Sequence, residues 1–254
     1  RRLGPSDLAL LAAMNVAEVS VARRPRVALL ATGDELVMPG DAPGPDQIIA
    51  SNIFALKAMV DAAGGEGVIL PIAPDREEAL EAEMAEMATA DIAVTIGGAS
   101  VGDYDLVGRV GAGLGMERAF YKIAMRPGKP LSFGTLGKAH VMGIPGNPVS
   151  AYVCAVLFLQ PAIRALQGAL FPAPRVLKAR LKKPMAANDG REDYVRGFVT
   201  QGADGVLEAV AHDLQDSSAL LPLARSNALL IRPPHAPTAA EGALVDVIPL
   251  DTLF

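Results

Sequence analysis

The stretch VALLATGDEL, residues 27–36, decides the fold, because an unbroken apolar run leads directly into a polar turn that contains a glycine. Five consecutive apolar residues, Val27–Ala31, are typical of a parallel strand that is covered on both faces. Similar runs occur at Ile92–Ile96 and Ala139–Ile144, and each is again followed by a loop that contains glycine. The sequence therefore predicts buried parallel strands with polar loops at their carboxyl ends.

Helical patterns alternate with these strands. Apolar positions recur at helical spacing after Ser51, within residues 75–88 and within residues 149–166, and a further short strand is predicted at residues 68–70. This alternation is typical of an α/β fold with a doubly wound, mostly parallel sheet and helices on both faces.

The pattern changes at Phe171-Pro172-Ala173-Pro174, which is typical of a linker. The segments after it are short, extended and separated by turns, which predicts a small all-β, barrel-like domain. We therefore expect three parts: residues 1–24, the α/β domain at 25–171 and the β domain at 172–254. Within the first part we expect a short helix capped by Ser6 and then a connecting strand.

Composition narrows the class of protein. The chain has 254 residues and a formal net charge of −5 with scattered basic residues, which argues against a nucleic-acid surface. Its single cysteine, Cys154, excludes an internal disulfide and is expected to be a core residue, and three histidines without ligand spacing indicate no zinc site. The longest apolar stretch is short of a membrane span, and the N-terminus does not resemble a signal peptide. We therefore expect a cytoplasmic protein without a membrane partner.

Three loops are expected at the carboxyl edge of the sheet, where such folds bind ligands. They are Thr32-Gly33-Asp34-Glu35, the stretch from Gly97-Gly98 through Ser100 and Gly102 to Asp105, and Pro145-Gly146-Asn147-Pro148-Val149-Ser150. Glycines let backbone N–H groups approach an anion closely, and the start of a helix adds a favourable dipole. Together the loops predict a site for a phosphorylated ligand, although a single glycine turn is more often structural.

Carboxylates and cations refine this prediction. Glu35, Asp75 and Asp105 each follow a predicted strand, and their convergence on an anion site would require a hard cation such as Mg²⁺. For Asp75 a helix cap, and for Asp34 a turn, are equally good alternatives.

Lys122, Arg126 and Lys129 lie in an irregular segment and suit an oxyanion, the alternative being scattered surface cations. In the β domain, the chemistry of Arg191, Arg196 and the Asp216-Ser217-Ser218 turn alone favours a solvated surface. We expect the acidic side chains, the cationic segment and the three loops to meet in one pocket.

Taken in order, these motifs resemble a known family. Thr32–Leu36, Ser51-Asn52, Gly97–Asp105, Arg126–Pro130 and Pro145–Ser150 are similar to the MoeA and gephyrin E-domain family of molybdopterin molybdenumtransferases. The first motif alone is shared with related pterin-binding domains, but those relatives lack the β domain that follows Pro174.

The resemblance implies the chemistry. Members insert molybdenum from molybdate into adenylylated molybdopterin, release AMP and need a divalent cation, usually Mg²⁺. It implies essential acidic roles for Glu35, Asp75 and Asp105, and a basic cluster of Lys122, Arg126 and Lys129, in which Arg126 replaces a common lysine. It also places Ser100 near the oxyanion and, more loosely, implies that Arg196 and Ser217 reach the site.

The resemblance also implies partners and limits. Family members are homodimers, work with an upstream adenylyltransferase and begin with two further regions, of which residues 1–24 resemble only the end. We therefore expect reduced activity from this chain alone. The alternatives are a non-catalytic pterin-binding or scaffold module and a molybdopterin adenylyltransferase relative.

Overall fold

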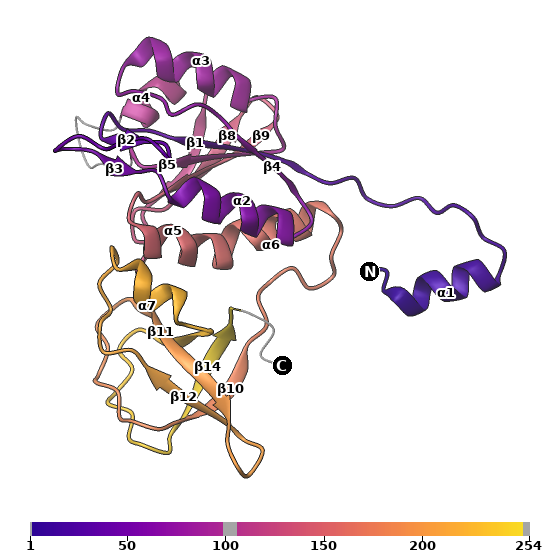
Figure 1. Cartoon of the computed structure of the whole chain (residues 1–254), viewed down its shortest axis with the longest axis vertical. Coiled ribbons are helices and arrows are strands. Elements are labelled where there is room, and N and C mark those ends of the chain that lie inside the picture. Colours follow the sequence, from indigo (N-terminus) through magenta and orange to yellow (C-terminus); the bar gives the residue numbers. More distant parts are fainter. Residues whose placement is uncertain (1, 99–105, 251–254) are drawn as a thin grey trace.

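The computed structural model describes residues 2–98 and 106–250, which form an α/β domain, a β domain and an N-terminal arm (Figure 1). The α/β domain contains a six-stranded sheet in the order β4-β1-β5-β9-β8-β6. Four of these strands, β4, β1, β5 and β9, are parallel, and β8 and β6 extend the sheet antiparallel. The strands are β1 (Arg26–Ala31), β4 (Glu66–Ile69), β5 (Ile92–Ile96), β6 (Glu117–Tyr121), β8 (Ser132–Leu136) and β9 (Ala139–Ile144).

Helices cover both faces of this sheet, and alternate residues of β1 show how. Leu29 packs in one core cluster with Leu56 of α2, whereas Leu30 packs in a second cluster with Met84 of α3. One face carries α2 (Asn52–Ala62), α5 (Pro148–Cys154), a π-helical turn (Ala155–Leu159) and α6 (Gln160–Leu166), and the other carries α3 (Glu77–Met87) and α4 (Leu106–Gly113). The predicted mostly parallel sheet with helices on both faces is confirmed.

The C-terminal domain is a closed ring of five strands. The order β12-β10-β14-β13-β11 is closed by pairing between β11 and β12, as the predicted barrel requires. The ring strands are β10 (Leu177–Leu181), β11 (Glu192–Gln201), β12 (Leu207–Ala211), β13 (Ala228–Arg232) and β14 (Leu244–Pro249), and α7 (Leu220–Ala224) lies between β12 and β13.

A short strand joins the two domains. The strand β7 (Met125–Arg126) belongs in sequence to the α/β domain, yet it pairs in parallel with β11 of the barrel. A second short ribbon, β2 (Leu36–Val37) with β3 (Ile48–Ile49), lies beside the carboxyl end of β1. The ribbon, and Pro130 in the segment after β7, lie next to the carboxyl ends of β1, β5 and β9.

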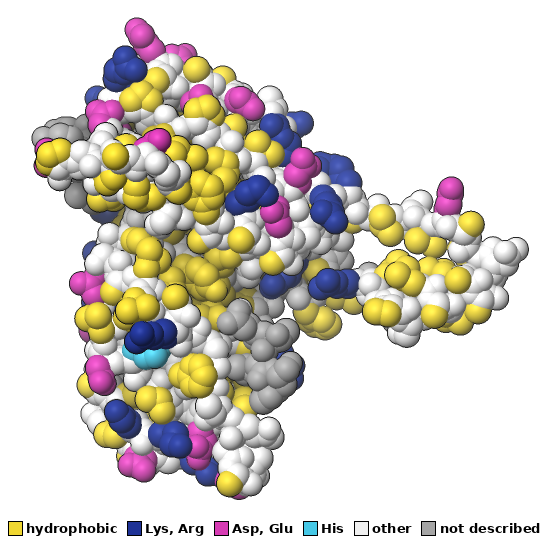
Figure 2. All heavy atoms as spheres, viewed as in Figure 1, with side chains coloured by type: hydrophobic (Ala, Val, Ile, Leu, Met, Phe, Trp, Pro, Cys, Tyr) yellow, Lys and Arg dark blue, Asp and Glu magenta, His cyan; other side chains and the backbone are white. Residues whose placement is uncertain are grey.

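The N-terminal arm differs from its prediction. The helix α1 (Pro5–Ala13) is capped by Gly4, whose N–H donates to the Asp7 carboxylate at 2.8 Å, and not by Ser6. No strand occurs in residues 14–25, so the expected connecting strand was wrong, and this segment runs as an extended link. None of the residues of α1 is buried, and Figure 2 shows apolar side chains gathered on the arm.

One described helix, Pro148–Leu166, is long and apolar enough to cross a membrane by length and composition. Half of its most apolar window is buried, because it packs against α2 and the sheet. Its apolar character is therefore explained by its place in the core. Cys154 lies in this helix and is buried, as predicted.

Candidate functional site

Two adjoining cavities could hold a ligand. One lies at the carboxyl edge of the sheet, and the other lies between the α/β domain and the barrel. The first, which we call the sheet-edge cavity, has a volume of about 590 Å³. It is bordered by the ends of β1, β5 and β9, the β2–β3 ribbon and the starts of α2 and α5. Its lining includes Thr32, Glu35, Leu36, Ile48, Asn52, Gly97, Gly98, Pro130, Pro145, Gly146, Asn147 and Ser218.

The loop after β5 can lie this close to its neighbour only because it contains two glycines. Gly97 and Gly98 have φ angles of 91° and 62°. A Cβ on Gly97 would lie 2.8 Å from the Thr32 carbonyl oxygen, and one on Gly98 would lie 2.9 Å from Thr32 Oγ1. Thr32 Oγ1 is buried and has no hydrogen-bond partner among the described residues. A buried hydroxyl without a partner at a cavity wall favours a ligand that completes its hydrogen bonding.

The third loop is held against α2. Asn52 Nδ2 donates to the Gly146 carbonyl oxygen at 2.6 Å, so the starts of α2 and α5 are joined at the cavity rim. This contact explains structurally why Ser51-Asn52 accompanies the Pro145-Gly146-Asn147 motif in the sequence.

Three carboxylates lie near one another beside the sheet-edge cavity. Asp34 Oδ1 accepts a hydrogen bond from the Asp75 backbone N–H at 3.1 Å. The pKa of Asp75 is raised, first by burial and then by the negative charges of Asp34 and Glu35. Asp75 does not cap α3, whose N-cap is Arg76, so the cap alternative is excluded.

These carboxylates do not form a complete metal site in the structure. No group of three or more ligating side chains is positioned to hold a metal ion within residues 2–98 and 106–250. Of Asp34, Glu35 and Asp75, only Glu35 lines the sheet-edge cavity. Asp105, Ser100 and Gly102 lie outside the described residues.

The second cavity, which we call the interdomain cavity, has a volume of about 600 Å³ and lies between the α/β domain and the barrel. Residues of both domains line it, including Arg126, Lys129, Pro130, Ser150, Asn188, Arg191, Asp193, Gln215, Ser217 and Arg232. Four of these side chains are cationic, which gives the cavity the charge that an oxyanion requires. Asp193 Oδ1 and Arg232 Nε are buried in its wall without a partner in the described part of the chain.

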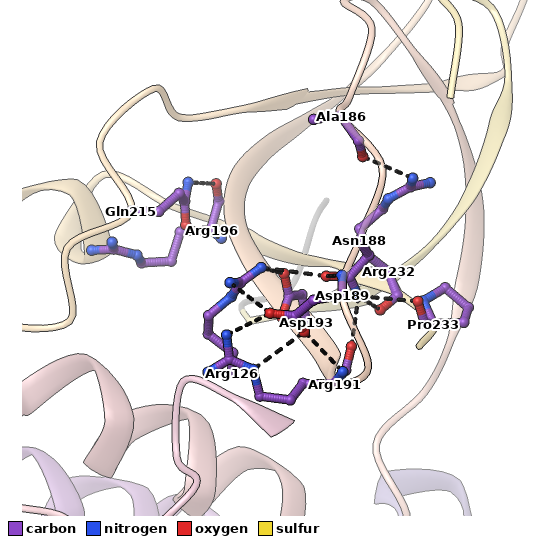
Figure 3. A network of polar contacts seen from close by, with 10 residues as sticks. All are labelled: Arg126, Ala186, Asn188, Asp189, Arg191, Asp193, Arg196, Gln215, Arg232 and Pro233. Carbon is purple, nitrogen blue, oxygen red and sulfur yellow. Dashed lines mark hydrogen bonds and ion pairs between the residues drawn. The ribbon is translucent and has the colours of Figure 1, made fainter. Parts of the chain in front are cut away.

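Arg126 is held by the barrel. Its guanidinium contacts the carboxylate of Asp193, Asp189 Oδ2 at 3.4 Å and Asn188 Oδ1 at 3.3 Å (Figure 3). The pairing of β7 with β11 places Arg126 directly opposite Asp193. Arg126 therefore fixes the position of the barrel as well as contributing charge to the cavity.

Asn188 and Asp189 were not among the predicted site residues, although Asn188 lines the interdomain cavity and Asp189 contacts Arg126 and Arg191. Asn188 Nδ2 donates to the carbonyl oxygens of Arg191, Arg232 and Pro233 at 2.6, 2.9 and 3.0 Å. These hydrogen bonds fix the turn and so position Arg191, which lines the cavity. The only available sequence signal was the Asn-Asp-Gly turn itself.

Neither Lys122 nor Arg196 lines one of the two cavities. The Lys122 ammonium lies 4.8 Å from the ring centroid of Tyr121, and Lys122 lines neither cavity. Arg196 is only 1% exposed, and its guanidinium donates to the carbonyl oxygens of Leu214, Asp216 and Ala219 at 3.2, 2.9 and 2.9 Å. In this structure Arg196 stabilises the loop that carries Ser217, and it does not itself reach a cavity.

That loop connects the two cavities. Asn147 Nδ2 donates to Ser217 Oγ at 3.1 Å, and the Val149 N–H donates to the Ser217 carbonyl oxygen at 3.0 Å. Ser217 therefore occupies one of the free N–H groups at the start of α5 that we had assigned to an anion. Ser217 lines one cavity, Ser218 lines the other, and Pro130 lines both.

The predicted site residues thus divide between two places instead of one pocket. Thr32, Glu35, Gly97, Gly98, Pro145, Gly146 and Asn147 line the sheet-edge cavity, and Arg126, Lys129, Ser150 and Ser217 line the interdomain cavity. Gly33, Asp34 and Asp75 line neither cavity. The Gly33 N–H donates instead to the Ala73 carbonyl oxygen at 3.2 Å.

Comparisons with known proteins agree with this architecture. Residues 28–165 match the family described as a probable molybdopterin binding domain, and residues 178–250 match the MoeA C-terminal region, domain IV. The chain is 38% identical over 238 residues to a molybdopterin molybdenumtransferase of Nostoc sp. strain PCC 7120, covering 91% of this chain and 54% of the relative. It is 35% identical over 255 residues to one of Haemophilus influenzae, covering 100% of this chain and 63% of the relative.

A solved structure shares the whole arrangement. The molybdopterin biosynthesis MoeA protein of Pyrococcus horikoshii matches with a TM-score of 0.83 at 29% sequence identity, covering 99% of this chain and 61% of that one. The chain therefore spans between half and two thirds of the length of these relatives.

Proposed function

This chain belongs to the MoeA family, and from that premise we propose that it binds adenylylated molybdopterin and molybdate for insertion of molybdenum into the pterin dithiolene, with release of AMP. The observation that carries the proposal is that two cavities of similar size adjoin at Pro130. One has glycine loops suited to a phosphorylated ligand, and the other has cations suited to an oxyanion. Two substrates bound there would meet at the shared wall.

The pterin substrate is assigned to the sheet-edge cavity. Backbone N–H groups of the Gly97-Gly98 and Gly146 loops would approach its phosphates, and the unpartnered Thr32 hydroxyl would hydrogen-bond to it. The apolar side chains of Leu36 and Ile48 in the β2–β3 ribbon would cover a flat ring system. Position and orientation of the substrate, without a covalent intermediate on the protein, are the contribution of this cavity.

Molybdate is assigned to the interdomain cavity. Within the described residues the Lys129 ammonium has no ion-pair partner, so its charge is available to the oxyanion. The hydroxyls of Ser150 and Ser217 line the same space and would donate hydrogen bonds to it. These groups would place the oxyanion beside the dithiolene by electrostatic attraction.

Mg²⁺ would be held by Glu35, Asp75 and Asp105 together with substrate phosphates. The donor chemistry fits, because carboxylate oxygens are its usual ligands. The pKa of Asp75 is raised by burial first and then by the negative charges of Asp34 and Glu35. Mg²⁺ commonly takes only one or two protein carboxylates and completes its shell with phosphate and water. When bound, the ion would neutralise phosphate charge, while Glu35 would hold it at the cavity wall.

Binding by the chain itself tests the proposal. Purified chain is titrated by calorimetry with adenylylated molybdopterin and with molybdate, separately and together, with and without Mg²⁺. We expect Lys129→Ala to weaken molybdate binding at least tenfold and to leave pterin binding unchanged, and Thr32→Val to do the reverse. Lys182→Ala, in an ion pair with Glu208 outside both cavities, is the control. Loss of both ligands from either single variant would argue against two separate sites.

A non-catalytic pterin-binding or scaffold role is the second candidate. Molybdenum incorporation by this chain, compared with a full-length relative, distinguishes the two. The match to the MoeA C-terminal region favours both candidates over an adenylyltransferase. Homodimer formation, a cytoplasmic location and cooperation with an upstream adenylyltransferase stay predictions from the sequence.

A further inference from the structure

The interdomain cavity contains more negative charge than an oxyanion site needs. Four cationic side chains line it, and the Asp193 carboxylate lines it as well. Asp189 lies just behind the lining and contacts two of the guanidinium groups. With both carboxylates ionised, the four cations are left with a formal excess of two positive charges, which equals the charge of one molybdate.

Asp189 is shared between Arg191 and Arg126. Arg191 donates to it from Nη2 at 2.6 Å, from Nε at 3.2 Å and from its backbone N–H at 2.9 Å. Arg126 Nη1 lies 3.4 Å from the same carboxylate (Figure 3). These contacts hold the pKa of Asp189 well below its usual range, chiefly through the side-chain hydrogen bond from Arg191. The carboxylate is therefore charged at neutral pH.

The remaining cations are not restrained by Asp189. The Arg232 guanidinium donates to the carbonyl oxygens of Ala186, at 3.0 Å, and of Pro237, and Lys129 has no ion pair within the described ranges. An oxyanion entering the cavity thus finds Lys129 available, but it must compete with Asp189 for Arg191, and with both Asp189 and Asp193 for Arg126.

We propose that Asp189 is a specificity-determining residue of the interdomain cavity: by neutralising Arg191 and adding a second, longer carboxylate contact to Arg126, it limits the affinity for anions and matches the cavity to a dianionic tetrahedral oxyanion. This rests on the proposed function, because it takes the interdomain cavity as the oxyanion site. Removing the charge of Asp189 frees Arg191 from its carboxylate partner, leaves Arg126 paired with Asp193 alone, and raises the cavity's excess positive charge by one. Every anion should then bind more tightly, and a dianion should gain more than a monoanion of the same shape.

The test uses Asp189→Asn in the full 254-residue chain. The asparagine keeps a side-chain oxygen for the Arg191 backbone N–H, so the turn is preserved. Binding of molybdate, a dianion, and perrhenate, a tetrahedral monoanion, is measured by calorimetry at low ionic strength. We expect molybdate affinity to rise about tenfold and perrhenate affinity about threefold, and both gains to shrink in high salt.

The matched control is Asp204→Asn. The Asp204 side chain is 49% exposed against 47% for Asp189, and it pairs with Arg180 at 2.9 Å on the barrel, away from both cavities. Its loss should change anion affinity less than twofold. If Asp204→Asn gained as much anion affinity as Asp189→Asn, the effect would come from the overall charge of the chain, and the proposed role of Asp189 would be overturned.

The outcomes separate the two claims. If the unaltered chain binds no molybdate, the proposed function fails and this inference fails with it. If the unaltered chain binds molybdate and Asp189→Asn binds it equally or more weakly, only the inference is overturned. Should Asp189→Asn not fold, Arg191→Gln provides the test: it leaves Asp189 with only the longer contact to Arg126 and should weaken molybdate binding at least fivefold, and unchanged binding would refute the proposal.

Discussion

Replacement of Arg196 by alanine tests whether this buried arginine stabilises the loop that carries Ser217 or contacts a ligand directly. The side chain is 1% exposed and donates to three carbonyl oxygens of the loop that carries Ser217. A hydrogen bond to a charged group contributes about 1.5–3 kcal/mol, and water can reach part of this surface loop after truncation. We therefore expect Arg196→Ala to lose about 3–5 kcal/mol of the free energy of unfolding, within the range seen when a buried hydrogen-bond network is broken. Because the loop positions Ser217, molybdate affinity should fall as well.

The measurement is urea unfolding at pH 7 followed by calorimetric titration at a temperature where the variant is folded. Arg180→Ala is the control, because Arg180 forms an exposed ion pair with Asp204 and should change stability by less than about 1 kcal/mol. If Arg196 instead contacted the ligand, the variant would keep the stability of the control and lose binding. That combination would refute the structural role argued here.

Three further predictions concern single side chains. Gly98→Ala places a Cβ 2.7 Å from Val107 Cγ2 at a φ of 62°. We therefore expect thermal unfolding to show a loss of about 1–3 kcal/mol in the free energy of unfolding, and pterin binding to weaken at least tenfold. Unchanged binding would contradict the close approach of this loop. The raised pKa of Asp75 means that its ionised form is disfavoured in the folded state, so stability is lost as pH rises through that pKa. Asp75→Asn should therefore melt at a higher temperature than the unaltered chain at pH 7, and the difference should disappear in acid. Burial raises the pKa of Cys154 to about 12, so at pH 8 its thiol should react with a maleimide only after unfolding in urea, and rapid labelling of the native chain would show that the helix core opens.

The sequence was sufficient to predict those elements whose own residues form a recognisable pattern. β1 is buried on both faces, so its composition alone indicates a central parallel strand. The edge strand β6 has mostly exposed residues and no clear alternation, and β7 is only two residues long, so neither has a pattern that distinguishes it from loop. The barrel strands were predictable because turns separate them, whereas the short helix α7 was not.

The predictions for individual site residues depended on contacts that sequence does not contain. Arg126 meets Asp189 and Asp193 across 63 and 67 residues, through a strand pairing between domains. Arg196 is satisfied by backbone carbonyl oxygens, which every residue type possesses, so no motif identifies its partners. The sequence therefore indicated that these arginines matter, but only the fold separates the one that lines a cavity from the one that supports a loop.

The two cavities depend differently on the barrel. The sheet-edge cavity is built from the α/β domain except for Ser218, so its glycine loops would persist without the C-terminal domain. The interdomain cavity has one wall from each domain, and its shape depends on the β7–β11 pairing, the Arg126–Asp193 contact and the two hydrogen bonds of Ser217. An oxyanion site of this kind arises only when both domains are present and docked. Under the proposed function, the barrel is therefore a structural component of one substrate site, and two of its buried charged residues, Asp193 and Arg232, line that cavity.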